Sequence, residues 1–61
     1  MKLELTAEEA KVLHEVLAGR LGDYSAEIAA TDNPSFRRQL RERRDVVHRV
    51  QLQLEPYVTA P

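Results

Sequence analysis

Hydrophobic residues recur along the chain with the spacing of an α-helix, in two stretches separated by a short polar break. In the first stretch they lie about 3.6 residues apart, the repeat of one buried helix face, at Ala10, Leu13, Leu17, Leu21, Tyr24 and Ile28. The second stretch repeats in the same way, with an arginine at one of its six positions: Phe36, Leu40, Arg43, Val47, Val50 and Leu54. The pattern predicts two amphipathic helices.

The start of the first helix carries a specific signal. Thr6 and Glu9 have the S/T-x-x-E spacing of a capping box, in which the threonine hydroxyl accepts from the Glu9 amide and the glutamate reaches back. Thr6 is therefore the expected N-cap. The helical repeat continues from it and predicts a helix over about residues 7–30.

Prolines bound the second helix. Pro34 suits the first position of a helix and pushes Asn33 out of the helical conformation, which predicts a turn over 31–33. Pro56 is expected to stop the helix, because a proline inside a helix removes a hydrogen bond and clashes with the preceding turn. We expect a second helix over about 34–55 and a tail over 56–61.

Helices joined by so short a connection must fold back antiparallel. The numbers of facing residues then add up to about 64 in each of six layers, namely Ile28–Phe36, Tyr24–Leu40, Leu21–Arg43, Leu17–Val47, Leu13–Val50 and Ala10–Leu54. This agreement predicts an all-α fold in which residues 1–61 form one antiparallel two-helix hairpin.

Length and composition bear on how such a hairpin is stabilised. A chain of 61 residues buries little surface, and the absence of cysteine excludes disulfides and cysteine-ligated zinc. A small scaffold without these can still be stabilised by association with another chain, so we expect a homodimer that completes a four-helix bundle. The net charge of −1 creates no overall field that would draw nucleic acid. Apolar runs are too short for a membrane span or a signal peptide, so we expect a cytoplasmic protein with no membrane contact.

The first five residues leave two alternatives open. Lys2-Leu3-Glu4-Leu5 alternates polar and apolar residues, as a strand does. A single strand has no partner within this chain, so its leucines either pack on the helices, which we favour, or the segment pairs with its copy across a dimer.

Both flanks of the hairpin offer candidate interfaces. A step of one residue past each core position turns both antiparallel helices toward the same flank, where the first helix presents small residues at Ala18, Gly22, Ser25 and Ala29. A glycine inside a helix costs about 1 kcal/mol relative to alanine, which favours close approach of another helix at Gly22. The opposite flank carries Val12, Val16 and Val46. The pattern leaves open which flank a dimer or another protein partner would cover.

Arginines concentrate in the second helix and suggest an alternative function. Guanidinium groups match phosphate oxygens, so a small regulator could contact RNA or DNA through Arg37, Arg38, Arg41 and Arg44. Aromatic residues that would stack bases do not interleave with them. Acidic residues of the first helix could also pair with these arginines, and we favour a solvated or ion-paired face.

Catalytic and metal-binding patterns are weak. His14, His48 and Asp45 could be drawn as a metal site, but the inward glutamates and Glu-x-x-His repeats of helical metal sites are absent, so surface or interface histidines are the better interpretation. The sequence shows no nucleophile–histidine–acid set and no glycine-rich phosphate loop. We therefore expect no enzymatic activity, no metal and no cofactor.

One segment is more distinctive than the helical repeat around it. With Leu5-Thr6-x-Glu8-Glu9 and the leucines that follow, Glu27-Ile28-x-x-Thr31-Asp32 and Phe36-Arg37 resemble a set of small bacterial helical proteins whose function is unknown. In size and architecture the chain is also similar to the plasmid copy-number regulators that dimerise into four-helix bundles and bind RNA, without a matching motif. We expect Phe36 to close the hairpin end over Ile28 and Arg37 to reach Glu27 or Asp32. The alternative, a partner-docking tip, predicts an exposed Phe36.

Overall fold

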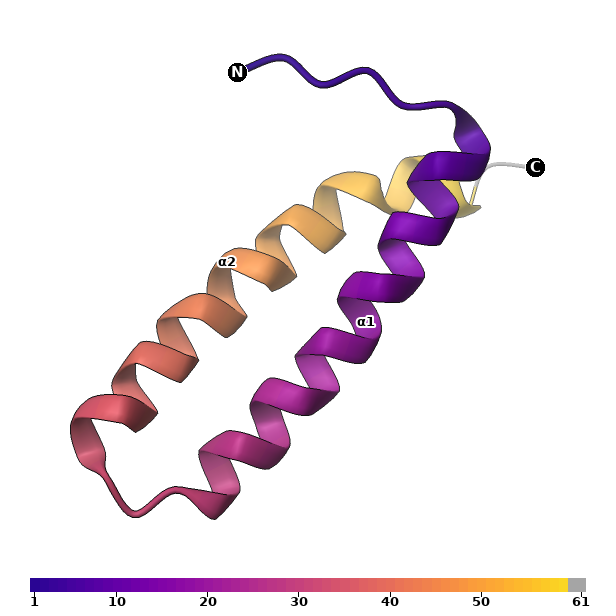
Figure 1. Cartoon of the computed structure of the whole chain (residues 1–61). Helices are drawn as coiled ribbons and strands as arrows, with labels where there is room; N and C mark the ends of the chain where they lie inside the picture. The colour runs from indigo at the N-terminus through magenta and orange to yellow at the C-terminus, as the bar shows by residue number, and fades with distance from the viewer. Residues whose placement is uncertain (60–61) are drawn as a thin grey trace.

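The computed structural model describes residues 1–59 and contains two helices that pack against each other, α1 (Ala7–Ala30) and α2 (Pro34–Thr59) (Figure 1). They run antiparallel and are joined by residues 31–33, so the predicted all-α hairpin is confirmed. The bounds of α1 match the prediction. The end of the predicted tail, residues 60–61, lies outside the described residues.

The capping box at the start of α1 is formed in full. The Glu9 amide donates to the Thr6 hydroxyl at 3.1 Å, and the Thr6 amide donates to the Glu9 carboxylate at 2.9 Å. The hydrogen bond from the Thr6 backbone, reinforced by the Thr6 side chain, lowers the pKa of Glu9. Two amides that would otherwise lack partners at the helix start are thereby satisfied.

The turn is held by short-range polar contacts. Asn33 caps α2, since its side-chain oxygen accepts from the Ser35 and Phe36 amides at 3.0 and 3.1 Å. Arg37 does not reach Glu27 or Asp32 as predicted; its guanidinium donates to the carbonyl of Thr31, at the C-terminal end of α1. A cation at this position also offsets the negative end of the α1 dipole.

The predicted end of the second helix at residue 55 is wrong, because Pro56 does not end α2. The helix continues through the proline to Thr59, and Val58 is half-buried. Because proline has no amide hydrogen, the Leu52 carbonyl has no amide donor from position 56, and α2 forms one hydrogen bond fewer where it passes through Pro56. Continuing the helix places Val58 four residues beyond the buried Leu54, on the same face.

The two helices meet along a seam of regularly spaced residues. On α1 the least exposed residues follow a helical repeat, at Ala10, Leu13, His14, Leu17, Leu21, Tyr24 and Ile28. On α2 they are spaced alternately three and four residues apart, at Arg37, Leu40, Arg44, Val47, Gln51, Leu54 and Val58. This alternation is the repeat of helices that pack side by side at a small angle.

The seam of α2 is turned by one residue from the predicted stripe. Three residues that were expected in the core are exposed, namely Phe36, Arg43 and Val50. The residue that follows each of them is half-buried instead, namely Arg37, Arg44 and Gln51. The hydrogen bond from Arg37 to the turn holds its long side chain over the seam, where the methylenes of arginine can cover apolar surface. More apolar side chains are thereby left on the outside.

The core that results is small. Among the described residues the buried hydrophobic ones are Ala10, Tyr24, Leu40 and Leu54, and no large side chain is fully buried. These four fall in two of the predicted layers, near the two ends of the hairpin. Between them Leu13, Leu17 and Leu21 stay half-buried. The chain is a plate of 43 × 23 × 13 Å, one helix thick.

Candidate functional site

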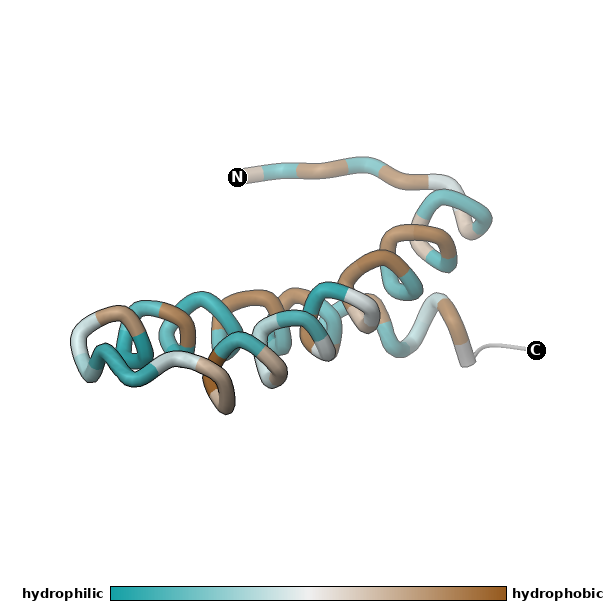
Figure 2. The backbone as a smooth tube through the Cα atoms, turned by 60° about the horizontal axis from the view of Figure 1, so that its bottom comes forward, coloured by the Kyte–Doolittle hydropathy of each residue, from teal (hydrophilic) through white to brown (hydrophobic). Residues whose placement is uncertain are grey.

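The N-terminal segment, residues 1–5, doubles back from the start of α1 over the open end of the hairpin. Figure 2 shows it standing clear of both helices, with alternating hydrophobic and hydrophilic residues. It forms no strand, and Leu3 and Leu5 are 65% and 37% exposed. Both leucines line a groove beside the helices but stay exposed, so the packing on the helices that we favoured is not achieved within the described residues.

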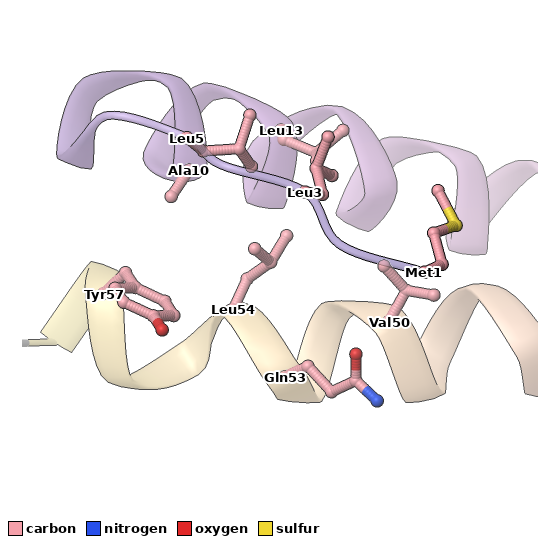
Figure 3. A pocket seen from close by; sticks show the side chains of 9 residues that line it. All are labelled: Met1, Leu3, Leu5, Ala10, Leu13, Val50, Gln53, Leu54 and Tyr57. Atoms are coloured by element: carbon pink, nitrogen blue, oxygen red, sulfur yellow. The ribbon is translucent and has the colours of Figure 1, made fainter.

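A groove lies between this segment and the helices, which we call the end groove (Figure 3). Its volume is about 590 Å³, and every lining residue except Gln53 is apolar or aromatic: Met1, Leu3, Leu5, Ala10, Leu13, Val50, Gln53, Leu54 and Tyr57. Met1 is fully exposed at this groove. The groove is open to solvent, and none of the described residues fills it.

One flank of the plate is a second apolar surface. Residues one position before each seam residue share this flank, and we call it the valine face, formed by Val12, Val16 and Arg20 of α1 and Phe36, Arg43, Val46 and Val50 of α2. The predicted interface residues Val12, Val16 and Val46 are 49%, 60% and 52% exposed. A hollow lined by Tyr24, Glu42, Arg43, Val46 and Val47 lies between the helices on this side.

The opposite flank, which we call the alanine face, carries the small residues of α1. Ala18, Gly22, Ser25 and Ala29 are all exposed. A Cβ atom added at Gly22 would meet nothing within 4 Å, so the close helix approach expected at this glycine does not occur within the chain. The Ser25 hydroxyl donates to the carbonyl of Leu21 at 3.1 Å, which satisfies it without a partner. On α2 this face carries charged and polar residues together with the exposed Leu52.

The four candidate nucleic-acid arginines do not share one exposed stripe. Arg37 and Arg44 are half-buried in the seam, and Arg44 lies 3.8 Å from the carboxylate of Asp45. Arg38 and Arg41 are exposed on the alanine face. The structure therefore leaves only two of the four candidate guanidinium groups exposed on one face, those of Arg38 and Arg41.

Phe36 lies at the turn end of the valine face and is 46% exposed. It does not close the hairpin end over Ile28 as we expected, because the rotation of α2 carries it outward. The alternative, in which Phe36 is exposed at the tip of the hairpin, agrees with this position.

His14 is placed by a hydrogen bond that the sequence analysis missed. Its Nε2 atom lies 3.0 Å from a carboxylate oxygen of Glu55, across the seam between the two helices. Their residue numbers add up to 69 rather than to about 64, so the predicted layers gave no reason to pair them. No three His, Cys, Asp or Glu side chains within residues 1–59 gather closely enough to hold a metal ion, and His48 and Asp45 do not join His14.

Neither helix in the described part of the chain combines the length and apolar character needed to cross a membrane. Comparison with family models, with curated proteins and with solved structures gave no match for this chain. The geometry of the two faces and the end groove is thus the basis on which function is inferred.

Proposed function

We propose that this protein is a non-enzymatic interaction module whose working form is a dimer of hairpins, a four-helix bundle. The observation that carries the proposal is the surface the chain leaves open. Its accessible surface is 4920 Å², whereas a folded monomer of 7.0 kDa exposes about 4000 Å². The excess of about 900 Å² is close to the roughly 800 Å² that each partner buries in a standard protein interface.

The shape supports the same proposal. Stable domains pack at least two layers of secondary structure around a core, and this plate is one layer thick at 13 Å. Its radius of gyration is 13.6 Å, against about 10.5 Å for a compact domain of this length. A second hairpin stacked on one face would supply the missing layer.

The exposed side chains are of the kind that interfaces bury. Among the described residues ten large hydrophobic ones are exposed, and most lie on the valine face or beside the end groove: Met1, Leu3, Leu5, Val12, Val16, Phe36, Val46, Val50, Leu52 and Tyr57. Contiguous apolar surface on a small protein marks a site of association. The biological role that follows is scaffolding or regulation of another macromolecule by the dimer.

Sedimentation equilibrium tests the proposal directly. We expect a species of twice the 7.0 kDa chain mass at micromolar concentration. The variant Val16→Ser/Val46→Ser should shift the equilibrium toward monomer, and Gly19→Ser serves as the matched control on an exposed site away from both faces. A wild-type chain that stays a folded monomer at millimolar concentration would contradict the proposal.

A further inference from the structure

The valine face of α2 carries a stripe that reads nearly the same in both directions. The stripe is centred on Val46 and spaced alternately three and four residues apart, with Phe36, Gln39 and Arg43 before the centre and Val50, Gln53 and Tyr57 after it. An aromatic residue stands at each end, with a glutamine inside it. Phe36, Val46, Val50 and Tyr57 are between 39% and 63% exposed, so the hairpin itself does not use them.

Such a pattern suits one kind of contact. In a two-fold dimer the same patch meets itself, so the patch must be complementary to its own reversed copy. A two-fold axis that crosses α2 at Val46, at right angles to the helix, meets this condition. It sets Val46 against the partner's Val46, Gln39 against the partner's Gln53, and Phe36 against the partner's Tyr57.

We propose that two copies of this chain pack with their α2 helices antiparallel across Val46, each inserting Phe36 into the end groove of the other. The inference rests on the dimer proposed above and assigns its buried face, its direction and its central contact. Phe36 lies ten residues before Val46 and Tyr57 eleven after it, which are about 15 and 16 Å along a helix. Each Phe36 therefore reaches the partner's groove at the level of Tyr57.

The end groove has the properties this contact needs. It is apolar, and Val50, Leu54 and Tyr57 line its α2 wall. Val50 and Tyr57 belong to the same stripe of α2 as Phe36. Leu3 and Leu5 form the opposite wall, so the N-terminal segment would close over the inserted ring. Phe36 and Tyr57 are both rigid aromatic side chains, which favour contact with each other in interfaces.

Charges near the centre of the contact also bear on its direction. Glu42 and Arg49 lie four residues before and three after Val46, so each Glu42 comes within one residue of the level of the partner's Arg49, twice in the dimer. Arg43 lies level with the same arginine of the partner, and Glu42 offsets the repulsion between them. In the other stacking, with both turns at the same end, α1 would lie on the partner's α2. Arg20 would then come near the partner's Arg43, and such like charges disfavour an interface.

The antiparallel arrangement does bring Glu9 toward the partner's Glu27. Both residues are exposed and lie near the ends of α1, at the rim of the proposed interface, where salt screens their repulsion.

Single-cysteine variants test the geometry, because the chain has no cysteine of its own. Disulfides require Cα atoms within about 7 Å. On mild oxidation Val46→Cys should form a disulfide-linked dimer with itself. Phe36→Cys alone should not, since the two Phe36 positions are about 30 Å apart, but a mixture of Phe36→Cys and Tyr57→Cys should cross-link.

Two other cross-linking patterns would contradict the proposed arrangement. Efficient cross-linking in a mixture of Phe36→Cys and Glu27→Cys would show that both turns lie at one end, because α1 then lies on the partner's α2. Linking of Gly22→Cys without linking of Val46→Cys would show that the alanine face is buried. Either result overturns the inference while leaving a dimer in place. If the reduced variants and the wild type all sediment as monomers, the proposed function itself fails.

A charge exchange provides a second measurement that needs no cysteine. Glu42→Arg or Arg49→Glu alone should weaken the dimer roughly tenfold, because each change alters two symmetry-related pairs. The double variant Glu42→Arg/Arg49→Glu should recover the wild-type dissociation constant. A double variant that dimerises as weakly as the single variants would overturn the antiparallel pairing, and circular dichroism of each variant checks that it remains helical.

Discussion

Replacing Gly22 with alanine distinguishes between the two faces of the hairpin. Gly22 lies in the middle of α1 with an ordinary helical backbone, and no glycine in the described chain has a positive φ. An added methyl group would meet no atom within 4 Å. Within one hairpin the substitution therefore changes helix propensity alone.

The expected gain is about 1 kcal/mol per chain, the difference between glycine and alanine inside a helix. In a domain of this size such a gain raises Tm by about 4–8 °C. Because the proposed dimer buries the valine face, Gly22 stays on the open alanine face, and the gain should persist in the dimer. Gly19 is equally free of neighbours and lies on neither face, so Gly19→Ala is the matched control.

Thermal unfolding followed by circular dichroism, at several protein concentrations, measures both variants. We expect Gly22→Ala and Gly19→Ala to raise Tm by similar amounts at every concentration. A Gly22→Ala variant that loses stability or dimerises less well, while Gly19→Ala gains, would refute the reasoning. It would mean that another helix approaches the alanine face closely enough to need a glycine.

The remaining predictions concern the core, the helix start and the charged surface. Leu40→Ala should destabilise the chain by about 2–5 kcal/mol, since Leu40 is 4% exposed, whereas Leu52→Ala should change the urea midpoint little, since Leu52 is 53% exposed. Thr6→Ala should cost about 1 kcal/mol through loss of the N-cap, measured by urea unfolding at pH 7; equal midpoints for wild type and variant would contradict the role of the cap. Because folding lowers the pKa of Glu9, the contribution of its carboxylate is present above the unfolded value of 4.5 and is lost as the pH falls through the lower folded-state pKa. An acid titration of wild type and Glu9→Gln by circular dichroism should converge at low pH, and a constant gap would contradict this. The split arginines predict no salt-dependent retention of the chain on RNA or DNA at physiological ionic strength, and retention that falls linearly on a double-logarithmic salt plot would instead support the nucleic-acid alternative.

Local signals predicted much of this fold because they act within a few residues. The Thr6–Glu9 box and the Asn33-Pro34 pair have direct backbone partners, so the start of each helix follows from short-range chemistry. Pro56 was misleading because its local cost competes with the burial of Val58, which is half-buried in the folded chain. Propensity alone cannot weigh burial that depends on the tertiary structure.

The candidate site was harder to predict because it depends on the rotation of α2. Leu40, Val47 and Leu54 recur every seven residues, and a helix seam needs a second position between them. Hydrophobicity selects Phe36 and Val50 for that position, with Arg43 between them by spacing alone. The structure instead uses the residue after each of these, Arg37, Arg44 and Gln51. The hydrogen bond of Arg37 to the turn contributes to this choice, and only the folded chain reveals it. The rotation exposes Phe36 and Val50. Because the sequence placed both residues in the core, it could not predict the proposed interface.

We propose that the hairpin has a stable core only when two copies of the chain pack together. Dilution of the wild-type chain, with helicity followed by circular dichroism and mass by sedimentation equilibrium on the same samples, tests it most directly. If the dimer is the folded unit, helix content should fall over the same concentration range in which the 7.0 kDa monomer appears. A monomer that keeps its full helix content at the lowest measurable concentration would contradict the claim.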